Sequence, residues 1–267
     1  MSIQVFHLHL SQSERLVWLL EELQVPYELT VFERDPVTGL APQGLKDIVS
    51  ASFYPVALAT PVNPPPPRQN PAGTAPYFRD ATVSPPVAIS ESGAIVEYIL
   101  TVHGQPKIGS GAPRLRRTPD DNDYAAYLEW FHFANGTLQP ALIRSMSLLF
   151  AGAYETPFGK RMEEKIHSIL KLVDDRLANN KWLAGEELSA ADIMTVFSLT
   201  TMRGFYPVLD LSQHKNILRY LQDVADRPAY REALKKGDKG MAPLIGPKVD
   251  AFTQFESMAP LFRSLKD

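Results

Sequence analysis

Three short polar segments lie where a helix is expected to begin, and their residue types are suited to binding anions. They are Ser11–Glu14, Glu91–Ser92 and Ser189–Asp192. A helix N-terminus presents unpaired N–H donors and partial positive charge, so such a segment can hold an anion or simply cap its own helix. The first and third have the Ser-x-x-acid spacing of a capping box, and we expect both boxes to form. We interpret Ser189 and Asp192 as purely structural.

Other chemistries are limited by what the sequence lacks. The 267 residues include no cysteine, which excludes disulfides, thiolate metal sites and cysteine nucleophiles. Any sulfur chemistry must therefore use a thiol that a ligand brings in. His7 and His9 alternate on one face of an expected strand, but no third ligand is near in sequence. We expect them to make core or solvent contacts and predict no metal site.

Length and charge restrict the partners and the location. The chain is long enough for two folding units. A net charge of -3 gives no reason to expect nucleic acid or an anionic membrane as a partner. No apolar stretch reaches the roughly 20 residues needed to span a bilayer, and the N-terminus has no features of a secretory signal. A cytoplasmic location is the default expectation.

The first hundred residues predict a strand–helix–strand unit, a long loop, and then two strands and a helix. A helix is expected between Ser11 and Pro26, with a short one inside Gly39–Ile48 and a third at Glu91–Val102. The loop, Asp35–Pro71, is rich in proline, glycine and alanine. The expected strands are Ile3–His9, Tyr27–Glu33, Tyr77–Arg79 and Val87–Ile89.

The rest of the chain predicts helices only. Residues 104–119 are polar, basic and rich in glycine and proline, as is typical of an interdomain linker. The expected domains are therefore 1–103 and 120–239, followed by a tail, 240–267, that is partly helical near Phe252–Phe262. The expected helices are Tyr124–Phe150, Phe158–Leu177, Ser189–Met202 and Gln213–Leu234, with Pro207 and Pro228 as interruptions.

This order of elements resembles the soluble glutathione transferases, which have an α/β thioredoxin-like N-terminal domain plus an all-α C-terminal domain. The resemblance extends over almost the whole chain and is strongest to serine-type members, including fungal and bacterial ones. The motifs that carry it are Ser11–Arg15 with Trp18–Leu23 for the first helix, Asn70–Pro76 for the cis-proline segment, Ser90–Ile95 for the start of the third helix, Tyr127–Pro140, and Trp182–Asp192 for the buried capping motif.

The resemblance implies a position for each part of glutathione. Ser11 matches the serine whose hydroxyl donates to the sulfur, with Ser13 as the nearest substitute. Ala75, before a cis peptide bond at Pro76, would pair with the cysteinyl backbone of glutathione as an added strand does. Gly73 stands where some related proteins carry a histidine for the glycine carboxylate, so that contact is either missing here or supplied by Lys46.

At the start of the third helix, the resemblance implies a site for the γ-glutamyl end. The Ser92 hydroxyl and the local N–H groups would hold its carboxylate, and Glu91 would take its ammonium group. Lowering a thiol pKa from about 8.5 to about 6.5 requires roughly 2.7 kcal/mol of selective stabilisation of the thiolate. A hydrogen bond to a charged group contributes about 1.5–3 kcal/mol and a helix N-terminus about 0.3–1 kcal/mol, which together suffice.

The implied activity is conjugation of the glutathione thiolate to small apolar electrophiles, a detoxification reaction, with peroxide or disulfide reduction as a variant. Glutathione is the co-substrate, no metal is needed, and a homodimer is implied. The alternatives are a dedicated biosynthetic transferase for one natural-product intermediate, and a non-catalytic interaction module like the gamma subunit of translation elongation factor 1. Candidate walls of the electrophile pocket are the aromatic residues Tyr124, Tyr127, Phe131, Phe133 and Phe205, each of which is also a candidate for plain core.

One segment departs from the family pattern. About 21 residues, Val49–Gln69, separate Ile48 from Asn70, where family members pass within a few residues. If this segment is removed in thought, the flanking residues join as a compact family segment. The hypotheses are a surface loop near the glycine end of glutathione and translated intron sequence.

Overall fold

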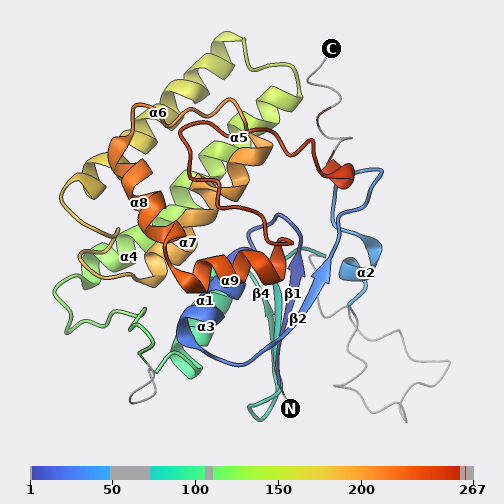
Figure 1. Ribbon diagram of the computed structural model, residues 1–267, viewed down its shortest axis with the longest axis vertical. Coiled ribbons are helices and arrows are strands. Elements are labelled where there is room, and N and C mark those ends of the chain that lie inside the picture. The colour runs from blue at the N-terminus through green and yellow to red at the C-terminus, as the bar shows by residue number, and fades with distance from the viewer. Residues whose placement is uncertain (1, 49–72, 106–110, 259–261, 263–267) are drawn as a thin grey trace.

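The structure is a computed structural model that describes residues 2–48, 73–105, 111–258 and 262. A four-stranded sheet with three helices forms its first half, and an all-helical half follows (Figure 1). The predicted fold class, thioredoxin-like α/β followed by all-α, is confirmed. The predicted insertion, 49–69, lies outside the described residues. The domain boundaries stay a prediction.

The sheet is mixed, in the order β2-β1-β3-β4. Strand β1 pairs in parallel with β2 and antiparallel with β3, which also pairs antiparallel with β4. The alternation of buried residues along β1, with Val5 and His7 fully buried, is that of a central strand. The bounds are β1 (Ile3–Leu8), β2 (Glu28–Phe32), β3 (Tyr77–Asp80) and β4 (Val87–Ser90), each within two residues of its prediction.

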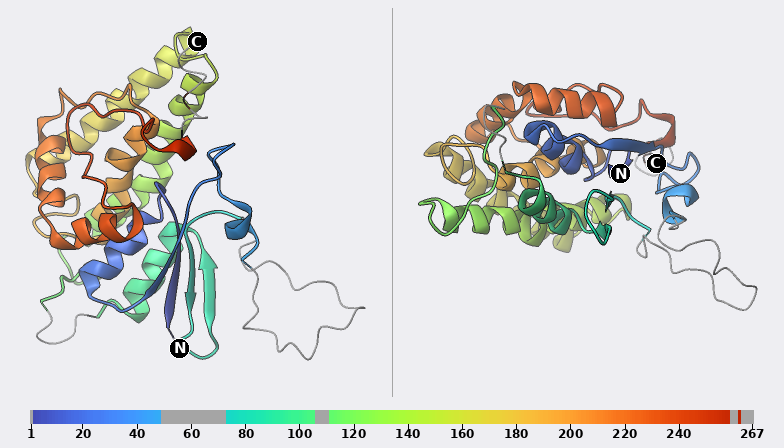
Figure 2. Two further views of the ribbon diagram at one scale, coloured as in Figure 1. Left: turned by 45° about the vertical axis from the view of Figure 1, so that its right-hand side comes forward. Right: turned by 90° about the horizontal axis from the view of Figure 1, so that it is seen from below.

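Three helices accompany the sheet, namely α1 (Glu14–Leu23), α2 (Gln43–Lys46) and α3 (Ser92–Val102). Helix α1 is buried on nearly all sides because α3, α7 and α9 all pack against it. Seen from below, α9 forms one outer layer, α1 and the sheet the middle, and α3 to α5 the opposite layer (Figure 2). The Ala75–Pro76 bond is cis, as predicted, and Ser84–Pro85 is a second cis bond.

The helical half differs from its prediction in its first helix. The expected long helix Tyr124–Phe150 contains a π-helical turn, η2, between α4 and α5. The expected helix Gln213–Leu234 is interrupted before Pro228, as predicted, because proline has no N–H to continue the backbone ladder. The bounds are α4 (Tyr124–Phe133), η2 (Ala134–Leu138), α5 (Gln139–Phe150), α6 (Pro157–Ala178), α7 (Ala190–Leu199), the 3-10 helix η3 (Thr201–Phe205), α8 (Lys215–Ala225), α9 (Pro228–Gly237) and a final 3-10 turn, η4 (Glu256–Met258).

One apolar core extends through both halves of the molecule. At their junction the ring of Trp18 on α1 lies 4.9 Å from the ring of Tyr230 on α9, edge to face. The described part of the expected linker is irregular but docked, since Leu115 is fully buried and the Arg117 Nε donates to Asp123 at 2.8 Å. The first strand and the last helices are therefore held against each other by packed side chains.

Candidate functional site

The turn between β1 and α1 holds both predicted serines. The Ser11 Oγ lies 2.7 Å from the Ser13 Oγ and accepts a hydrogen bond from the Ser13 N–H at 3.3 Å. Ser13 is completely buried, whereas Ser11 retains an exposed fraction of 8%. Of the two hydroxyls, that of Ser11 is therefore the one that a ligand can contact.

The capping box predicted at Ser11–Glu14 is wrong. Ser13 is the residue that precedes α1, and the Ser11 side chain bonds to Ser13 instead of the N–H of Glu14. The Glu14 carboxylate turns into the interior and accepts a hydrogen bond from the Thr201 hydroxyl. Its Oε1 atom has no hydrogen-bond partner among the described residues. Burial, and next the charge of Asp238, raise the pKa of Glu14.

Behind Ser13 lies a buried histidine and a buried aspartate. The Ser13 Oγ is 2.8 Å from His7 Nδ1, and His7 Nε2 is 3.4 Å from Asp238 Oδ1. The same aspartate oxygen accepts the Leu10 N–H at 2.7 Å. His7 is therefore in the core, which is one of the two environments, core or solvent, that were predicted for it.

His9 is also a core residue. Its ring packs edge to face on Phe255 with centroids 5.0 Å apart, and burial lowers the pKa of its imidazole. Arg34 fixes the same turn from outside by donating to the carbonyls of His9, at 3.0 Å, and Leu10, at 2.7 Å. In the part of the chain that the structure describes, no three His, Asp or Glu side chains are grouped as a metal site requires.

A second polar cluster surrounds the buried guanidinium of Arg15. Its Nη1 donates to Gln12 Oε1 at 3.1 Å and to Ser92 Oγ at 3.0 Å. Gln12 Nε2 in turn reaches the Ala75 carbonyl oxygen at 3.5 Å. These contacts connect the turn after β1, the cis-proline segment and the start of α3. The positions predicted for three parts of glutathione are thereby brought to one place.

The helical half completes this cluster. Arg15 Nη1 donates to Asn135 Oδ1 at 2.9 Å, and Nη2 donates to Gln139 Oε1 at 2.8 Å. Asn135 also donates to Ser92 Oγ at 3.3 Å. The π-helical turn that carries Asn135 inserts an extra residue per turn, a feature frequent at functional sites. The described residues that accept hydrogen bonds from Arg15 are all neutral, so these bonds do not cancel its positive charge as an ion pair would.

The remaining predicted glutathione residues lie around this cluster. Glu91 is exposed at the start of α3, with a backbone φ of 76°. Ser92 is 2% exposed, and its oxygen accepts two hydrogen bonds, so its own O–H is the part left for a ligand. Lys46, on α2, lies against Gly73, since a Cβ on that glycine would be 3.2 Å from the Lys46 Cγ. Lys46 is therefore next to the cis-proline segment.

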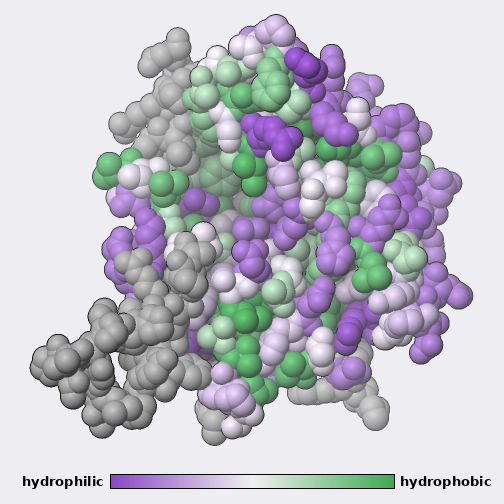
Figure 3. Space-filling model, turned by 180° about the vertical axis from the view of Figure 1, so that it is seen from behind, coloured by the Kyte–Doolittle hydropathy of each residue, from purple (hydrophilic) through white to green (hydrophobic). Residues whose placement is uncertain are grey.

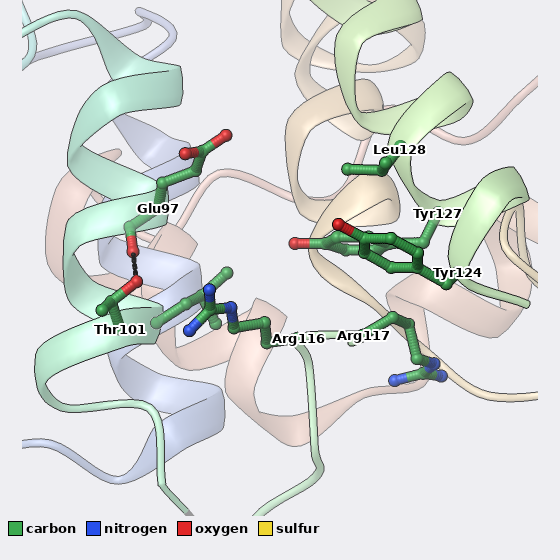
Figure 4. A pocket seen from close by; sticks show the side chains of 8 residues that line it. Glu97, Thr101, Arg116, Arg117, Tyr124, Tyr127 and Leu128 are labelled. Atoms are coloured by element: carbon green, nitrogen blue, oxygen red, sulfur yellow. Dashed lines mark hydrogen bonds between the residues drawn. The ribbon is translucent and has the colours of Figure 1, made fainter. Parts of the chain in front are cut away.

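The predicted electrophile pocket does not form as one wall, which corrects the prediction. Tyr124 and Tyr127 line a cavity of about 130 Å³ between α3 and α4, together with Arg116 and Glu97 (Figure 4). Phe131 lines a different cavity, of about 330 Å³, with Asn135 and Met194 among its neighbours. Tyr127 and Phe131 themselves are core residues. Both cavities belong to the α3 and α4 face, where apolar and polar areas are interspersed (Figure 3).

Phe205 lies elsewhere, because it follows α7 on the 3-10 turn η3. Its ring is 5.1 Å from the ring of Phe252 and 5.1 Å from the guanidinium of Arg34, which binds the turn before Ser11. Phe133 is partly buried and packs against the core, with its ring 4.8 Å from that of Trp130. On a helix rich in aromatic residues, residue type does not specify which way a ring faces. The sequence therefore could not separate pocket residues from core residues among these five.

Five residues of the two polar clusters were not predicted as site residues. Arg15 and Gln12 stood inside a motif but carried no assigned role. Asn135 and Gln139 are four residues apart on a helix and offered no signal without knowledge of the π-helical turn. Asp238 follows a glycine at the end of α9, 231 residues from His7 in sequence, and only the fold brings the two together.

Comparisons with known proteins agree with this architecture. A family model for the glutathione S-transferase C-terminal domain matches residues 144–228. Glutathione S-transferase 3 of Schizosaccharomyces pombe is 29% identical over 249 residues, covering 88% of this chain and 87% of that protein. The disulfide-bond oxidoreductase YfcG of Escherichia coli is 27% identical over 159 residues, which are 58% of this chain and 67% of that protein.

The solved structures give the same result for the fold. A glutathione transferase family member from Pseudomonas fluorescens, with two glutathione molecules bound, superposes with a TM-score of 0.66 at 21% identity. The match covers 87% of this chain and 92% of that one. No helix in the described part of our chain has the length and apolarity to cross a membrane. Motifs, fold and relatives agree: the chain is similar to glutathione S-transferases over most of its length, and it has their fold.

Proposed function

We propose that this protein binds glutathione in the site that joins Ser11, Ala75 and Ser92, and transfers its thiolate to small apolar electrophiles. The observation that carries the proposal is the network from Ala75 through Gln12 and Arg15 to Ser92. Gln12 directly follows Ser11 in the chain. Glutathione is an extended molecule with a carboxylate at each end and a thiol between them. A site for it needs separated polar ends and a backbone edge, and this cluster has both.

Electrostatics at the start of α3 supports binding of the γ-glutamyl carboxylate there. The buried guanidinium of Arg15 lies directly behind the Ser92 hydroxyl, and the helix N-terminus adds partial positive charge. Burial lowers the pKa of Arg15 to about 9, so it is still charged at neutral pH. A ligand carboxylate would therefore neutralise the positive charge of Arg15, which its neutral hydrogen-bond partners do not compensate. Glu91, exposed at the same helix start, would accept the ammonium group.

Disulfide reduction through the same thiolate is the second proposed activity. The name of one relative, a disulfide-bond oxidoreductase, favours it. The mixed disulfide would form when the glutathione thiolate attacks a disulfide in place of an electrophilic carbon. The lack of cysteine in our chain means that glutathione itself must supply every reacting thiol. Phe205, near Arg34 and the turn before Ser11, is the aromatic residue that we propose to contact the second substrate.

The proposal is tested by calorimetric titration of glutathione into wild type and the double variant Glu91→Ala, Ser92→Ala. Conjugation of a chloronitrobenzene and reduction of a small disulfide are followed in the same samples. We expect wild type to bind and turn over, and the double variant to bind at least tenfold more weakly. Losing a hydrogen bond to a charged group costs about 1.5–3 kcal/mol, which is roughly 10- to 150-fold in affinity.

A Glu129→Ala variant serves as the matched control, since Glu129 is an exposed glutamate on α4 outside the network. It is expected to bind as wild type does. Circular dichroism verifies that each variant is folded. If wild type failed to bind glutathione, the transferase proposal would be rejected, and an interaction module would be the better reading. Binding with turnover of only one specific intermediate would favour a biosynthetic transferase.

A cytoplasmic homodimer is also part of the proposal, and the resemblance to soluble glutathione transferases supports it. The face between α3 and α4 carries exposed apolar side chains, Val102 at 42% and Leu128 at 37%. Pairing this face with a second copy would cover them. Light scattering measures the mass in solution, and a mass of one chain would contradict this part of the proposal.

A further inference from the structure

Four side chains form a continuous hydrogen-bonded series that starts at Ser11 and ends inside the protein. The order is Ser11, Ser13, His7 and Asp238, with successive contacts of 2.7, 2.8 and 3.4 Å. The inner three are at most 1% exposed, whereas Ser11 is 8% exposed. The series therefore has a single end that a ligand can reach. The function proposed above leaves the inner residues unexplained.

Donors and acceptors balance when His7 is neutral and carries its proton on Nε2, facing Asp238. The Ser13 hydroxyl then donates to His7 Nδ1, and its oxygen accepts from the Leu8 N–H, at 3.2 Å, and from the Ser11 hydroxyl. The Ser11 oxygen accepts from the Ser13 N–H and has one lone pair left. In this state Ser11 presents an acceptor to the ligand, which suits a neutral thiol.

The hydrogen bonds of the series can also run in the opposite direction. Donors and acceptors then balance equally well when His7 carries protons on both nitrogens. His7 Nδ1 then donates to the Ser13 oxygen, and the Ser13 hydroxyl donates to Ser11. Both lone pairs of the Ser11 oxygen are now occupied, and its hydrogen is directed at the ligand. In this state Ser11 presents a donor, which suits a thiolate. The protonation state of His7 thus determines what Ser11 offers to sulfur.

We propose that His7 takes up the proton of the glutathione thiol through Ser13 and Ser11, and that Asp238 holds the resulting imidazolium. This inference rests on the function proposed above. The S–H proton passes to the Ser11 oxygen while the Ser11 hydroxyl proton passes to Ser13 and the Ser13 proton to His7 Nδ1. Sulfur keeps the electron pair of its S–H bond. One proton moves in net terms, and no electron is transferred.

The surroundings of His7 fix its ring in this position. Gly237 ends α9 against the imidazole, because a Cβ there would be 3.0 Å from His7 Nε2. Asp238 follows directly, and its Oδ1 is oriented by the Leu10 N–H. The charged and titratable groups around the His7–Asp238 pair are Glu14 of α1, His9 after β1, Glu33 and Arg34 after β2, Tyr230 of α9, and Lys239 after α9. His7 and Asp238 act through the serines and are positioning residues.

The test measures where the thiol proton goes when glutathione binds. Calorimetric titrations in two buffers of different ionisation enthalpy give the number of protons released, and ultraviolet difference absorbance gives the fraction of bound thiolate. Both are measured at about pH 8, above the usual histidine pKa of about 6.5 and below the usual thiol pKa of about 8.5. We expect wild type to form thiolate with almost no proton released. Release of one full proton for each thiolate formed would overturn the inference.

Two variants sharpen the result. His7→Gln preserves a hydrogen-bonding group next to Ser13 but cannot take up a proton, and Asp238→Asn preserves an acceptor for the Leu10 N–H without the charge. In both we expect the pKa of the bound thiol to rise by about one to two units, the size of a lost charge-assisted hydrogen bond. Unchanged thiolate absorbance and unchanged proton release in His7→Gln would contradict the proposal.

His103→Gln is the matched control. It removes another histidine–aspartate pair, His103 Nε2 to Asp80 Oδ2 at 2.6 Å, at the opposite end of β1. We expect no change in either readout. The wild-type experiment needs no variant, so the test stands even if His7→Gln does not fold. Absence of glutathione binding by wild type would reject the proposed function, whereas binding with full proton release would reject the proton path alone.

Discussion

Two helices of this chain are preceded by a serine with an acidic residue three positions later, and the two acids are used differently. At α7, Asp192 Oδ2 accepts the Ser189 N–H at 2.9 Å, and Oδ1 accepts the Leu183 N–H at 2.9 Å and the Tyr220 hydroxyl at 3.1 Å. These bonds lower the pKa of Asp192, although its burial raises it more. Near α1, Glu14 turns away from Ser11 and keeps one oxygen without a partner.

The comparison shows how a structural helix start differs from one available for chemistry. The α7 start satisfies its own polar groups, so nothing remains for a ligand. The α1 start keeps the Ser11 hydroxyl out of the cap and links it to buried groups. A buried polar atom without a partner costs about 1–3 kcal/mol, and such atoms concentrate where function requires them. Four variants separate the two roles.

The largest effect is expected for Asp192→Ala. It leaves the donors of Leu183, Ser189 and Tyr220 buried without their acceptor. We expect the free energy of unfolding to fall by about 4 kcal/mol, because several hydrogen bonds to a charged group are lost together. Urea unfolding measures it. If the folded variant lost less than a quarter of that free energy of unfolding, the capping motif would not be important for stability.

Ser11→Ala and Ser189→Ala compare the two serines directly. We expect Ser11→Ala to lower kcat/KM by roughly 10- to 150-fold, the loss of one hydrogen bond to a charged sulfur, with little change in stability. Ser189→Ala is expected to reduce the free energy of unfolding by about 1 kcal/mol, as for a lost N-cap, with unchanged kcat/KM. Unfolding and conjugation assays on both variants check this, and the reverse pattern would refute the comparison.

Glu14→Gln probes the partnerless carboxyl, and its effect is expected to be the smallest at low pH, where the carboxyl is protonated in both the folded and the unfolded chain. The folded-state pKa of Glu14 is raised by burial and Asp238, so the folded protein holds a proton that the unfolded chain releases. This stabilisation is complete below the ordinary carboxyl pKa and is lost as pH rises towards the raised folded-state pKa. The slope is at most about 1.4 kcal/mol per pH unit.

The glutamine variant cannot ionise, so its unfolding free energy should depend less on pH than that of wild type across this interval. Unfolding curves at several pH values provide the measurement. The exposed residue Glu129, changed to glutamine, is the control with no expected change of slope. Identical slopes in Glu14→Gln and wild type would contradict the burial argument.

Much of the fold was predictable because it depends on local patterns. Strand alternation located β1 to β4, and the Asn70–Pro76 motif predicted the cis bond before β3. The π-helical turn at Ala134–Leu138 was not predictable, since it is one extra residue in a continuous apolar pattern and depends on how α4 and α5 pack. The capping box at Ser11 failed because burial of Glu14 against Thr201 outweighed a local cap.

The candidate site was predictable only where a motif carried it. Ser11, Ala75 and Ser92 lie around one cluster, whose connecting residues, Gln12 and Arg15, had no spacing that indicated chemistry. The inner series could not be predicted, because His7 and Asp238 meet through tertiary packing alone. The predicted aromatic pocket residues lie at separate places for the same reason, because tertiary packing determines which layer each side chain faces.

The contact between β1 and the end of α9 has a consequence for the order of synthesis. His7 is made at the start of translation, and Asp238 follows 231 residues later. A nascent chain, or one truncated before Gly237, contains both serines but lacks the aspartate beside the histidine. The proposed proton path is therefore completed only when nearly the whole polypeptide has left the ribosome and its two halves have docked.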